Sequence, residues 1–320
     1  MHAIRVSAPG PIEALRYEEV EPAALRPGEV RVRLQAIGVN YIDVYHRNGL
    51  YALPTPFTPG SEAAGLVTEI GPGVTGFAVG DHVAYAMVRG AYTEQANVPA
   101  DMLVHVPDGV DLHVAAAAML QGMTAHYLVT STFVVASGTI ALVHAAAGGV
   151  GGLLVQMAKQ RGARVLATAS TSKLDQVREL GADEVIDYTA SDFQSEVMRL
   201  TSGDGVHVVY DAVGRTTFDK SLECLRTRGM LVSYGQSSGA VAPFDPLRLG
   251  KKGAYITRPS LAHYIATRAE LEWRSRELLD SIRAGALRIR IDREIPLRDA
   301  GEAHRLLESR KTMGKLLLIP

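Results

Sequence analysis

The chain has 320 residues, 47% of them hydrophobic and 21% charged, with a formal net charge of −1. This composition is that of a soluble globular protein with an ample core, and the length predicts two domains or one large one. The near-neutral charge, with no basic block, argues against nucleic acid or an anionic membrane as partner, and no apolar run is long enough to cross a bilayer. The single cysteine, Cys224, excludes an internal disulfide and a multi-cysteine metal site.

The first 110 residues are predicted to be rich in strands. Residues 1–6 predict an opening strand without the basic and apolar segments of a secretory signal. With a single cysteine in the chain, a reducing cytoplasm is the simplest location. Val30, Val32 and Leu34 alternate with polar residues after a Pro-Gly turn, which is typical of a half-buried strand. The short strands that follow predict a barrel-like or strongly bent sheet. They cover residues 63–70, 82–87, 91–98 and 103–106.

Near residue 112 the pattern changes to helices and then to a regular alternation. Repeated units of a short apolar strand and a helix predict a parallel sheet covered on both faces, in a Rossmann-like domain. The predicted strands cover residues 139–143, 164–168, 184–186, 206–211, 230–234 and 254–257. The predicted helices cover residues 114–120, 124–131, 153–162, 172–180, 193–201 and 218–225. Two further helices, 268–284 and 299–308, and a strand, 315–319, are predicted to return to the first domain.

A glycine-rich stretch, residues 145–152, joins a predicted strand to a predicted helix. Against the dinucleotide-binding pattern G-x-G-x-x-G, the three glycine positions hold Ala146, Gly148 and Gly151, so two of them match. Glycine lets the backbone approach a pyrophosphate closely, and the helix N-terminus offers free N–H groups. The stretch therefore predicts a dinucleotide site, with a tight turn that binds nothing as the alternative.

The end of the next strand indicates which dinucleotide binds. In NAD-binding domains of this kind, an acidic residue about 20 positions past the glycines holds the ribose 2′-hydroxyl. Here that place reads Ser170-Thr171-Ser172-Lys173, with no acid. Hydroxyls can donate to a 2′-phosphate and an ammonium can neutralise it. NADPH is therefore predicted over NADH, although these hydroxyls can also cap the helix that follows.

Seven segments, in order along nearly the whole chain, carry a resemblance to a known family. They are 38–51 (GVNYIDVYHRNGLY), 60–65 (GSEAAG), 121–125 (QGMTA), 145–151 (AAAGGVG), 210–214 (YDAVG), 235–239 (GQSSG) and 257–259 (TRP). Together they resemble the NADPH:quinone oxidoreductases, the zeta-crystallin-like and zinc-independent branch of the medium-chain dehydrogenase/reductase superfamily. The resemblance implies an α/β fold with a GroES-like, β-rich catalytic domain over residues 1–112 and 258–320. It further implies a Rossmann NADPH-binding domain over residues 113–257, a cleft between the two domains, and a homodimer.

The same resemblance implies the site residues. Asn40, Tyr45 and Arg47 are the catalytic candidates: Tyr45 and Arg47 to contact a quinone oxygen, and Asn40 to orient the nicotinamide or the substrate. Asp43 is expected to be a structural acceptor rather than an acid. The implied cofactor contacts are Asn40, Asp43, Tyr45, Met123, Thr124, Gly148, Gly149, Val150, Ser170, Thr171, Lys173, Tyr188, Gly214, Gly235, Gln236, Ser237, Ser238, Arg258 and Lys315.

Zinc alcohol dehydrogenases of the same superfamily provide a contrast. They bind their catalytic zinc through a Cys, a His-Glu pair and a second Cys, whereas the corresponding places here hold residues 40–43, 61–62 and 120–121, without thiolate or imidazole. No metal is expected, so the expected chemistry is hydride transfer from NADPH to a small electrophile, a quinone. The alternatives are an enone or alkenal double-bond reductase and, from another class, a cofactor-binding structural or RNA-binding protein with little turnover.

Overall fold

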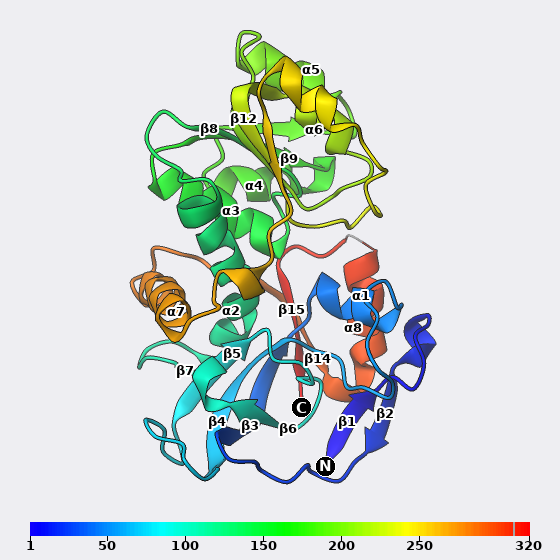
Figure 1. The fold of residues 1–320 in the computed structure, drawn as a ribbon, viewed down its shortest axis with the longest axis vertical. Coiled ribbons are helices and arrows are strands. Elements are labelled where there is room, and N and C mark those ends of the chain that lie inside the picture. Colours follow the sequence, from blue (N-terminus) through cyan, green and yellow to red (C-terminus); the bar gives the residue numbers. More distant parts are fainter. Residues whose placement is uncertain (310) are drawn as a thin grey trace. The chain divides into compact units, whose positions relative to one another are not determined.

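The computed structural model describes residues 1–309 and 311–320, and the chain forms two compact units. Unit 1 consists of Met1–Met123 and Tyr264–Pro320, and unit 2 consists of Thr124–His263. In Figure 1, unit 1 combines the blue and red ends of the colour scale, and unit 2 takes the green and yellow middle. Unit 2 is therefore an insertion in the chain of unit 1. Among the described residues, no helix combines the length and the apolar character needed to cross a membrane.

Unit 2 holds a six-stranded sheet in which every neighbouring pair of strands is parallel. The spatial order β10-β9-β8-β11-β12-β13 is the doubly wound order of a Rossmann domain, as predicted. Helix α3 packs on β8 and β9, and α5 and α6 pack against each other (Figure 1). The strands are β8 (Ile140–Val143), β9 (Arg164–Ala169), β10 (Glu184–Asp187), β11 (Val206–Asp211), β12 (Leu225–Ser233) and β13 (Tyr255–Thr257). The helices are α3 (Gly149–Gln160), α4 (Leu174–Glu179), α5 (Phe193–Leu200) and α6 (Phe218–Glu223).

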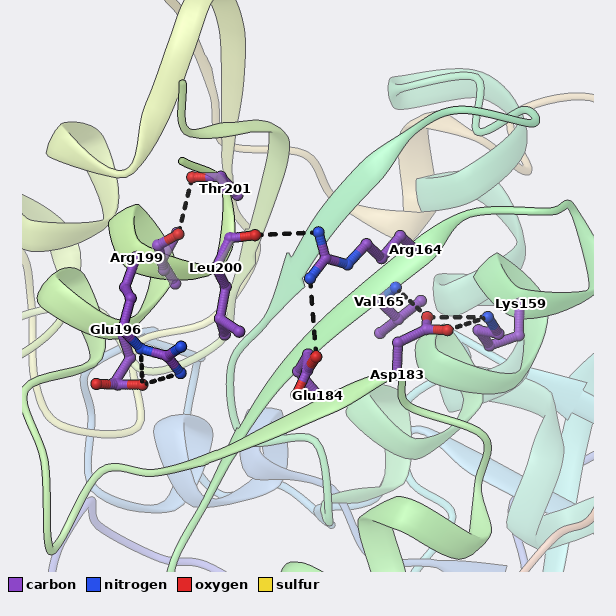
Figure 2. Close-up of polar contacts among 10 residues, drawn as sticks. Lys159, Arg164, Val165, Asp183, Glu184, Glu196, Arg199, Leu200 and Thr201 are labelled. Carbon is purple, nitrogen blue, oxygen red and sulfur yellow. Dashed lines mark hydrogen bonds and ion pairs between the residues drawn. The ribbon is translucent and has the colours of Figure 1, made fainter. Parts of the chain in front are cut away.

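Polar contacts at the amino ends of β9 and β10 tie this sheet to its helices. Lys159 Nζ donates to the two carboxylate oxygens of Asp183 at 2.7 and 2.8 Å, and the Val165 N–H donates to the same carboxylate at 2.7 Å (Figure 2). Beside them, Arg164 Nη1 donates to the Leu200 carbonyl at 3.0 Å. These contacts lie at the end of the sheet opposite to the carboxyl ends, where ligands bind in folds of this class.

Asp183→Asn is expected to weaken the folded state by about 0.5–1 kcal/mol near neutral pH, the range for a partly exposed ion pair. Partial burial opposes ionisation, but Lys159 and the Val165 N–H outweigh it and hold the pKa of Asp183 below its usual value. Because the folded-state pKa is the lower one, the carboxylate stabilises the fold above its unfolded-state pKa of about 4. That contribution is lost as pH falls through the folded-state pKa. Urea unfolding at several pH values checks this: the mutant should lose less stability on acidification than the wild type, and an identical loss would contradict the assignment.

Unit 1 is built on β3 (Glu29–Gly38), the longest strand of a seven-stranded sheet. One edge of β3 pairs with β4, and the other pairs first with β6 and then with β15. Two register shifts in the β3–β4 ladder bend the strands, in agreement with the predicted bent sheet. The other six strands of this sheet are β4 (Glu62–Ile70), β5 (His82–Ala86), β6 (Gln95–Pro99), β7 (Val104–His105), β14 (Ile291–Pro296) and β15 (Lys315–Ile319). Strands β1 (His2–Arg5) and β2 (Arg16–Glu19) form a separate two-stranded sheet. The helices include α1 (Tyr41–Arg47), α7 (Arg268–Arg283) and α8 (Ala300–Glu308).

The structure corrects the two separate helices predicted on either side of Gly122. A single helix, α2 (Leu112–Tyr127), runs through that position and is followed by one π-helical turn (Leu128–Thr132). A Cβ at Gly122 would lie 2.5 Å from Cδ1 of Leu278 in α7. The glycine therefore permits close packing of two helices instead of ending one.

Other element boundaries differ from the prediction for local reasons. Helix α3 begins at Gly149 and not at residue 153, because the glycines themselves form its first turn. Strand β12 begins at Leu225, five residues early, and passes through Arg228 in the left-handed region (φ 61°). Strands β2 and β14 and helix α1 were absent from the sequence prediction.

Candidate active site

The first candidate site residues, Asn40 and Asp43, form the start of helix α1 in unit 1. The Asp43 carboxylate accepts a hydrogen bond from the Asn40 N–H at 2.9 Å, which satisfies a backbone donor at the helix start. It also accepts from Ser61 Oγ at 3.1 Å and from Tyr92 Oη at 3.2 Å. Burial raises the pKa of Asp43 to about 7, against the opposing effects of the Asn40 N–H and the Lys315 charge. Asp43 is thus an acceptor that fixes the position of Asn40.

A hydrogen-bonded chain leads from Asp43 to Glu308 in α8. Arg47 donates to His304 Nδ1 at 3.1 Å, so the His304 proton resides on Nε2, which lies 3.0 Å from Tyr92 Oη. Burial, and then the Arg47 charge, lower the pKa of His304 to about 3, so the ring is neutral. Arg47 also donates to both Glu308 oxygens at 3.0 Å and is only 3% exposed. This geometry favours a structural role for Arg47 over contact with a quinone.

Tyr45 lies within an aromatic cluster on the same helix. Its ring centroid is 6.0 Å from that of Tyr41 and 5.2 Å from that of Tyr51, the latter in an edge-to-face arrangement. Tyr51 is 37% exposed, so the cluster borders on solvent. A tyrosine in such a cluster combines an apolar ring with a hydroxyl that can donate a hydrogen bond.

The Asn40 side chain belongs to a buried triangle with Glu62 at the start of β4 and Lys315 at the start of β15. Lys315 Nζ lies 2.6 Å from Glu62 Oε2 and 2.7 Å from Asn40 Oδ1, and Asn40 Nδ2 donates to Glu62 Oε2 at 2.8 Å. Glu62 is 0% exposed and Lys315 2%. The Lys315 ammonium was predicted to contact the cofactor. In the structure it donates to Asn40 and Glu62 of its own unit.

In unit 2, the glycine-rich stretch forms the turn between β8 and α3. Gly148 is the N-cap residue of α3, and Gly149, Val150 and Gly151 form its first turn. The N–H groups of a first turn lack partners within the helix and attract anions. Ala145 precedes them in the left-handed region, with φ 51°. The predicted strand, glycine turn and helix are therefore present in that order.

Gly151→Ala is expected to lower the stability of the fold by about 1–3 kcal/mol, the usual cost of overpacking. Its Cβ would lie 2.3 Å from the Ala145 carbonyl oxygen and 3.0 Å from the Ala146 Cα, and backbone atoms cannot swing away. Gly148→Ala is the matched control, since its nearest neighbour is that same oxygen at 3.1 Å. Thermal unfolding without cofactor should separate the two variants clearly. Equal losses of stability would contradict the role assigned to Gly151.

The loop after β9 carries the residues predicted for the 2′-phosphate. Lys173 lies in the 3₁₀ turn Thr171–Lys173, and its N–H donates to the Ser170 carbonyl at 2.9 Å. The Thr171 hydroxyl donates to Asp187 at the end of β10, at 2.5 Å. That bond uses the Thr171 proton, so Thr171 is a weaker candidate than Ser170 to donate to a phosphate. Tyr188, next along the chain from Asp187, is 52% exposed.

The loops that follow β11 and β12 are joined to each other. The Ser237 and Ser238 N–H groups donate to the Ala212 and Val213 carbonyls at 3.1 and 2.9 Å. Gly214 has φ 86°, and a Cβ there would lie 2.9 Å from the Gly239 carbonyl oxygen. A Cβ at Gly235 would be 2.6 Å from the Ala212 carbonyl oxygen. The predicted residues Gly214 and Gly235–Ser238 therefore share one crowded backbone arrangement.

Two of the predicted cofactor contacts near these loops, Arg258 and Ser238, donate hydrogen bonds to backbone carbonyls. Arg258 donates to the Ser233 and Gly235 carbonyls, both at 2.8 Å, and so orders the loop after β12. Ser238 Oγ donates to the Val213 carbonyl at 2.7 Å. Of the remaining cofactor candidates, Met123 and Thr124 lie in α2, and Gln236 lies in the loop that Arg258 holds.

Comparison with known proteins places this arrangement in a family. Residues 26–108 match the model for the alcohol dehydrogenase GroES-like domain, and residues 149–275 match that for zinc-binding dehydrogenase. The chain is 44% identical to a quinone oxidoreductase of Pseudomonas aeruginosa over 321 residues, which cover 99% of each chain. It is 43% identical to a 2-haloacrylate reductase of a Burkholderia species, over 95% of this chain and 94% of that protein. The crystal structure of Escherichia coli quinone oxidoreductase complexed with NADPH matches all of both chains with a TM-score of 0.98 at 41% identity.

The chain belongs to the quinone oxidoreductase family. It thereby belongs to the medium-chain dehydrogenase/reductase superfamily, as the sequence resemblance implied. The α/β fold with a GroES-like domain and a Rossmann domain is confirmed by the family models and by the structural match.

One of the two matching family models is that of zinc-binding dehydrogenase. In this quinone oxidoreductase family member, Glu62 lies at a place that corresponds to zinc ligands of the zinc alcohol dehydrogenases. Within residues 1–309 and 311–320, no group of three or more His, Cys, Asp or Glu side chains could hold a metal ion. The Glu62 carboxylate is instead paired with the Lys315 ammonium at 2.6 Å.

Several residues of this quinone oxidoreductase site were missed by sequence reasoning. Tyr92 and His304 join Arg47 to Asp43, and Glu62 receives the Lys315 ammonium. Two of them left a signal that pattern reading could have used. Glu62 is a lone acid at the start of an apolar strand, and His304 lies on the buried face of α8 next to Ala300 and Ala303.

Proposed function

We propose that this chain is an NADPH-dependent quinone reductase that works without a metal. The observation that carries the proposal is the full-length similarity, at 44% identity over 99% of both chains, to a quinone oxidoreductase. The match to a related structure complexed with NADPH supports the choice of cofactor. The two carboxylates around Asn40 support metal-free chemistry, since Glu62 is paired with the Lys315 ammonium and Asp43 already accepts from the Asn40 N–H, Ser61 and Tyr92.

The residues of unit 2 fit a phosphorylated dinucleotide. The turn before α3 ends in three alanines and Gly148, small residues that let the backbone approach a pyrophosphate, and the loop after β9 offers Ser170 and Lys173 with no acid at the end of β9. We assign Gly148, Gly149 and Val150 to the pyrophosphate. Tyr188 and the loops at Gly214 and Gly235–Ser238 are proposed to hold the rest of the cofactor. In this proposal residues 113–257 bind NADPH, and residues 1–112 and 258–320 supply the catalytic groups.

The catalytic task of the protein is to position the reactants and to stabilise developing negative charge. NADPH held by unit 2 would supply a hydride to the quinone, and the oxygen that gains negative charge would take its proton from solvent. Tyr45 is the proposed hydroxyl donor to that oxygen, since it belongs to a cluster that borders on solvent. Asn40 is the proposed contact of the nicotinamide. Arg47 supports α1 from within the fold and is not assigned to the substrate.

A second candidate function is the reduction of an activated double bond. The specific observation in its favour is the 43% identity, over 95% of this chain, to a 2-haloacrylate reductase. An enone or haloacrylate resembles a quinone as an electrophile that accepts hydride at carbon. The same hydride donor and the same hydroxyl donor would serve both reactions.

Steady-state assays of the purified chain with NADPH and a substrate panel test these functions. The panel holds 1,4-benzoquinone, 9,10-phenanthrenequinone, an enone and 2-chloroacrylate, each assayed with and without EDTA. We expect quinones to give the highest kcat/KM, with no effect of EDTA. Higher kcat/KM for the alkenes would favour the second candidate. NADPH binding without turnover of any compound would favour a structural role, and activity lost in EDTA and restored by zinc would refute the metal-free mechanism.

We also propose a cytoplasmic homodimer, as the family resemblance implies. The edge strand β13 supports the dimer, since it pairs on one side with β12 and its Tyr255 is 57% exposed. No nucleic acid or membrane partner is proposed. Light scattering after size-exclusion chromatography should give twice the 34.3 kDa mass of the chain. A monomeric mass would reject the dimer.

A further inference from the structure

The Glu62 carboxylate is a buried acceptor on which three elements of unit 1 converge. Its Oε1 accepts from the Leu120 N–H of α2 at 2.6 Å. Its Oε2 accepts from Asn40 Nδ2 at the start of α1, at 2.8 Å, and from Lys315 Nζ of β15, at 2.6 Å. A buried carboxylate needs this degree of satisfaction, because an isolated ionised group is costly to desolvate.

The end of β3 leaves space for this carboxylate. A Cβ at Gly38 would lie 2.2 Å from Glu62 Oε2 and 2.7 Å from the Ala116 carbonyl oxygen. Any residue other than glycine at this position would displace Glu62 or the backbone of α2. The site is therefore built into the backbone as well as into the side chains.

The two charges determine which way the Asn40 amide points. Glu62 can only accept hydrogen bonds and Lys315 can only donate them, so Asn40 Nδ2 must face Glu62 and Oδ1 must face Lys315. The second Nδ2 hydrogen is used by the Gly38 carbonyl at 3.2 Å. The capacity that remains on the Asn40 side chain is therefore a lone pair on Oδ1, so this side chain can accept a further hydrogen bond but cannot donate one.

We propose that Lys315 and Glu62 are positioning residues that lock the Asn40 carboxamide so that its Oδ1 accepts a hydrogen bond from the carboxamide N–H of the nicotinamide. This inference rests on the proposed NADPH function. It separates Lys315 from the residues that touch the cofactor and gives it a task inside unit 1. It also removes Asn40 from the donors available to a quinone oxygen.

The charged pair makes this lock stronger than a neutral pair would. A flipped Asn40 amide would turn its N–H groups toward the Lys315 ammonium and its oxygen toward the Glu62 carboxylate. Both charge-assisted hydrogen bonds would then be replaced by repulsive contacts. In Lys315→Met/Glu62→Gln both charges are removed, so either orientation of the Asn40 amide becomes acceptable. Preorganisation of a binding group reduces the entropy lost on binding.

The double variant Lys315→Met/Glu62→Gln tests the proposal. Each single change would leave one buried charge unpaired, whereas the double change removes both charges at similar volume and should fold. The measurement is the Kd, without quinone, for NADPH and for its 3-acetylpyridine analogue, which lacks the carboxamide N–H. In the wild type we expect the analogue to bind about 10-fold more weakly, as for one lost hydrogen bond. In the double variant we expect weaker NADPH binding and nearly equal Kd values for the two nucleotides.

Lys159→Met/Asp183→Asn is the matched control, because it removes an ion pair of similar length from unit 2. This control should keep the preference of about 10-fold for NADPH over the acetylpyridine analogue, which corresponds to one hydrogen bond. Asn40→Ala should abolish the preference by itself. The proposal is overturned if the Lys315/Glu62 double variant keeps the preference of the wild type. If the wild type binds no NADPH, the proposed function fails, and the inference falls with it. If the wild type reduces quinones and the double variant still prefers NADPH over its acetylpyridine analogue as the wild type does, the inference alone is refuted.

A measurement on the wild type keeps the proposal testable should the double variant not fold. In protein labelled with ¹⁵N-asparagine, the Asn40 side-chain amide is assigned by the signal that Asn40→Ala removes. Since both hydrogens are bonded internally, we expect slow exchange with solvent, both without nucleotide and with NADP⁺. Fast exchange of this amide would show that it is not locked and would overturn the proposal.

Discussion

Lys173→Ala is expected to weaken NADPH binding by about 10- to 100-fold, the value of one charge-assisted hydrogen bond. NADH has no 2′-phosphate, so its Kd should stay within about twofold, and the preference for NADPH should fall accordingly. The structure places Lys173 in the 3₁₀ turn directly after the end of β9, beside Ser170. Titration of each nucleotide into the wild type and the variant, followed by fluorescence or calorimetry, gives both constants.

The control for this experiment is Lys251→Ala, which removes the same charge from an exposed position of unit 2. It should leave both Kd values unchanged. Thr171→Ala should have less effect than Ser170→Ala, since the Thr171 hydroxyl is bonded to Asp187. If Lys173→Ala keeps the full preference for NADPH, the assignment of the 2′-phosphate to this loop is wrong.

Glu308→Ala is expected to destabilise the protein by about 3–5 kcal/mol, the cost of leaving a buried charge without its partner. The Arg47 side chain is 4% exposed and that of Glu308 is 36% exposed. Loss of Glu308 therefore leaves the buried guanidinium with only neutral acceptors, His304 and the Gly10 carbonyl. Arg47→Met, in contrast, leaves a carboxylate that can turn toward water. Chemical unfolding should show the smaller loss for Arg47→Met, although this change removes the more buried residue.

The double variant Arg47→Met/Glu308→Ala extends this test, since it should recover much of the stability lost in Glu308→Ala. Kinetics then separate structure from catalysis. Under conditions where it is folded, Arg47→Met should keep the quinone kcat of the wild type to within a few-fold. A large loss of kcat at preserved stability would assign Arg47 to the substrate. Equal stabilities of the two single variants would contradict the burial argument.

The β/α alternation of unit 2 could be predicted because each element carries its own signal. Short apolar strands and amphipathic helices follow one another, and the glycine turn lies where β8 ends. The predicted helix and strand boundaries were wrong where contacts between residues distant in the sequence determine them. Gly122 had the local signature of a helix end, and only its packing against Leu278 in α7 shows why α2 continues. The strand β14 lacks an apolar alternation and is held by its pairing with β15.

The residues of the candidate site likewise fall into those that a local sequence pattern predicts and those that it does not. The glycine turn and the loop at Ser170 and Lys173 are contiguous motifs, and their positions in the sequence give their positions in the fold. Residues joined only by the tertiary structure gave little signal. Arg47 stood in a motif, but its partner Glu308 lies in α8, and no local pattern connects them. The pairing of Glu62 with Lys315 likewise depends on the sheet order that brings β4, β3 and β15 together.

The insertion of unit 2 into unit 1 determines the order in which the protein can be completed during synthesis. The ribosome delivers β3 and β4 first, then the whole of unit 2, and only afterwards β15, which pairs with β3. Unit 2 is contiguous and can fold as soon as it emerges, whereas unit 1 waits for strand pairings of very high sequence separation. Until β15 arrives, this edge of β3 is paired with β6 at Glu29–Arg33 but lacks a partner at Ile37 and Gly38, and the Glu62 carboxylate lacks its cation. The nascent chain therefore carries an unfinished sheet through most of its translation, the stage at which a chaperone has a surface to protect.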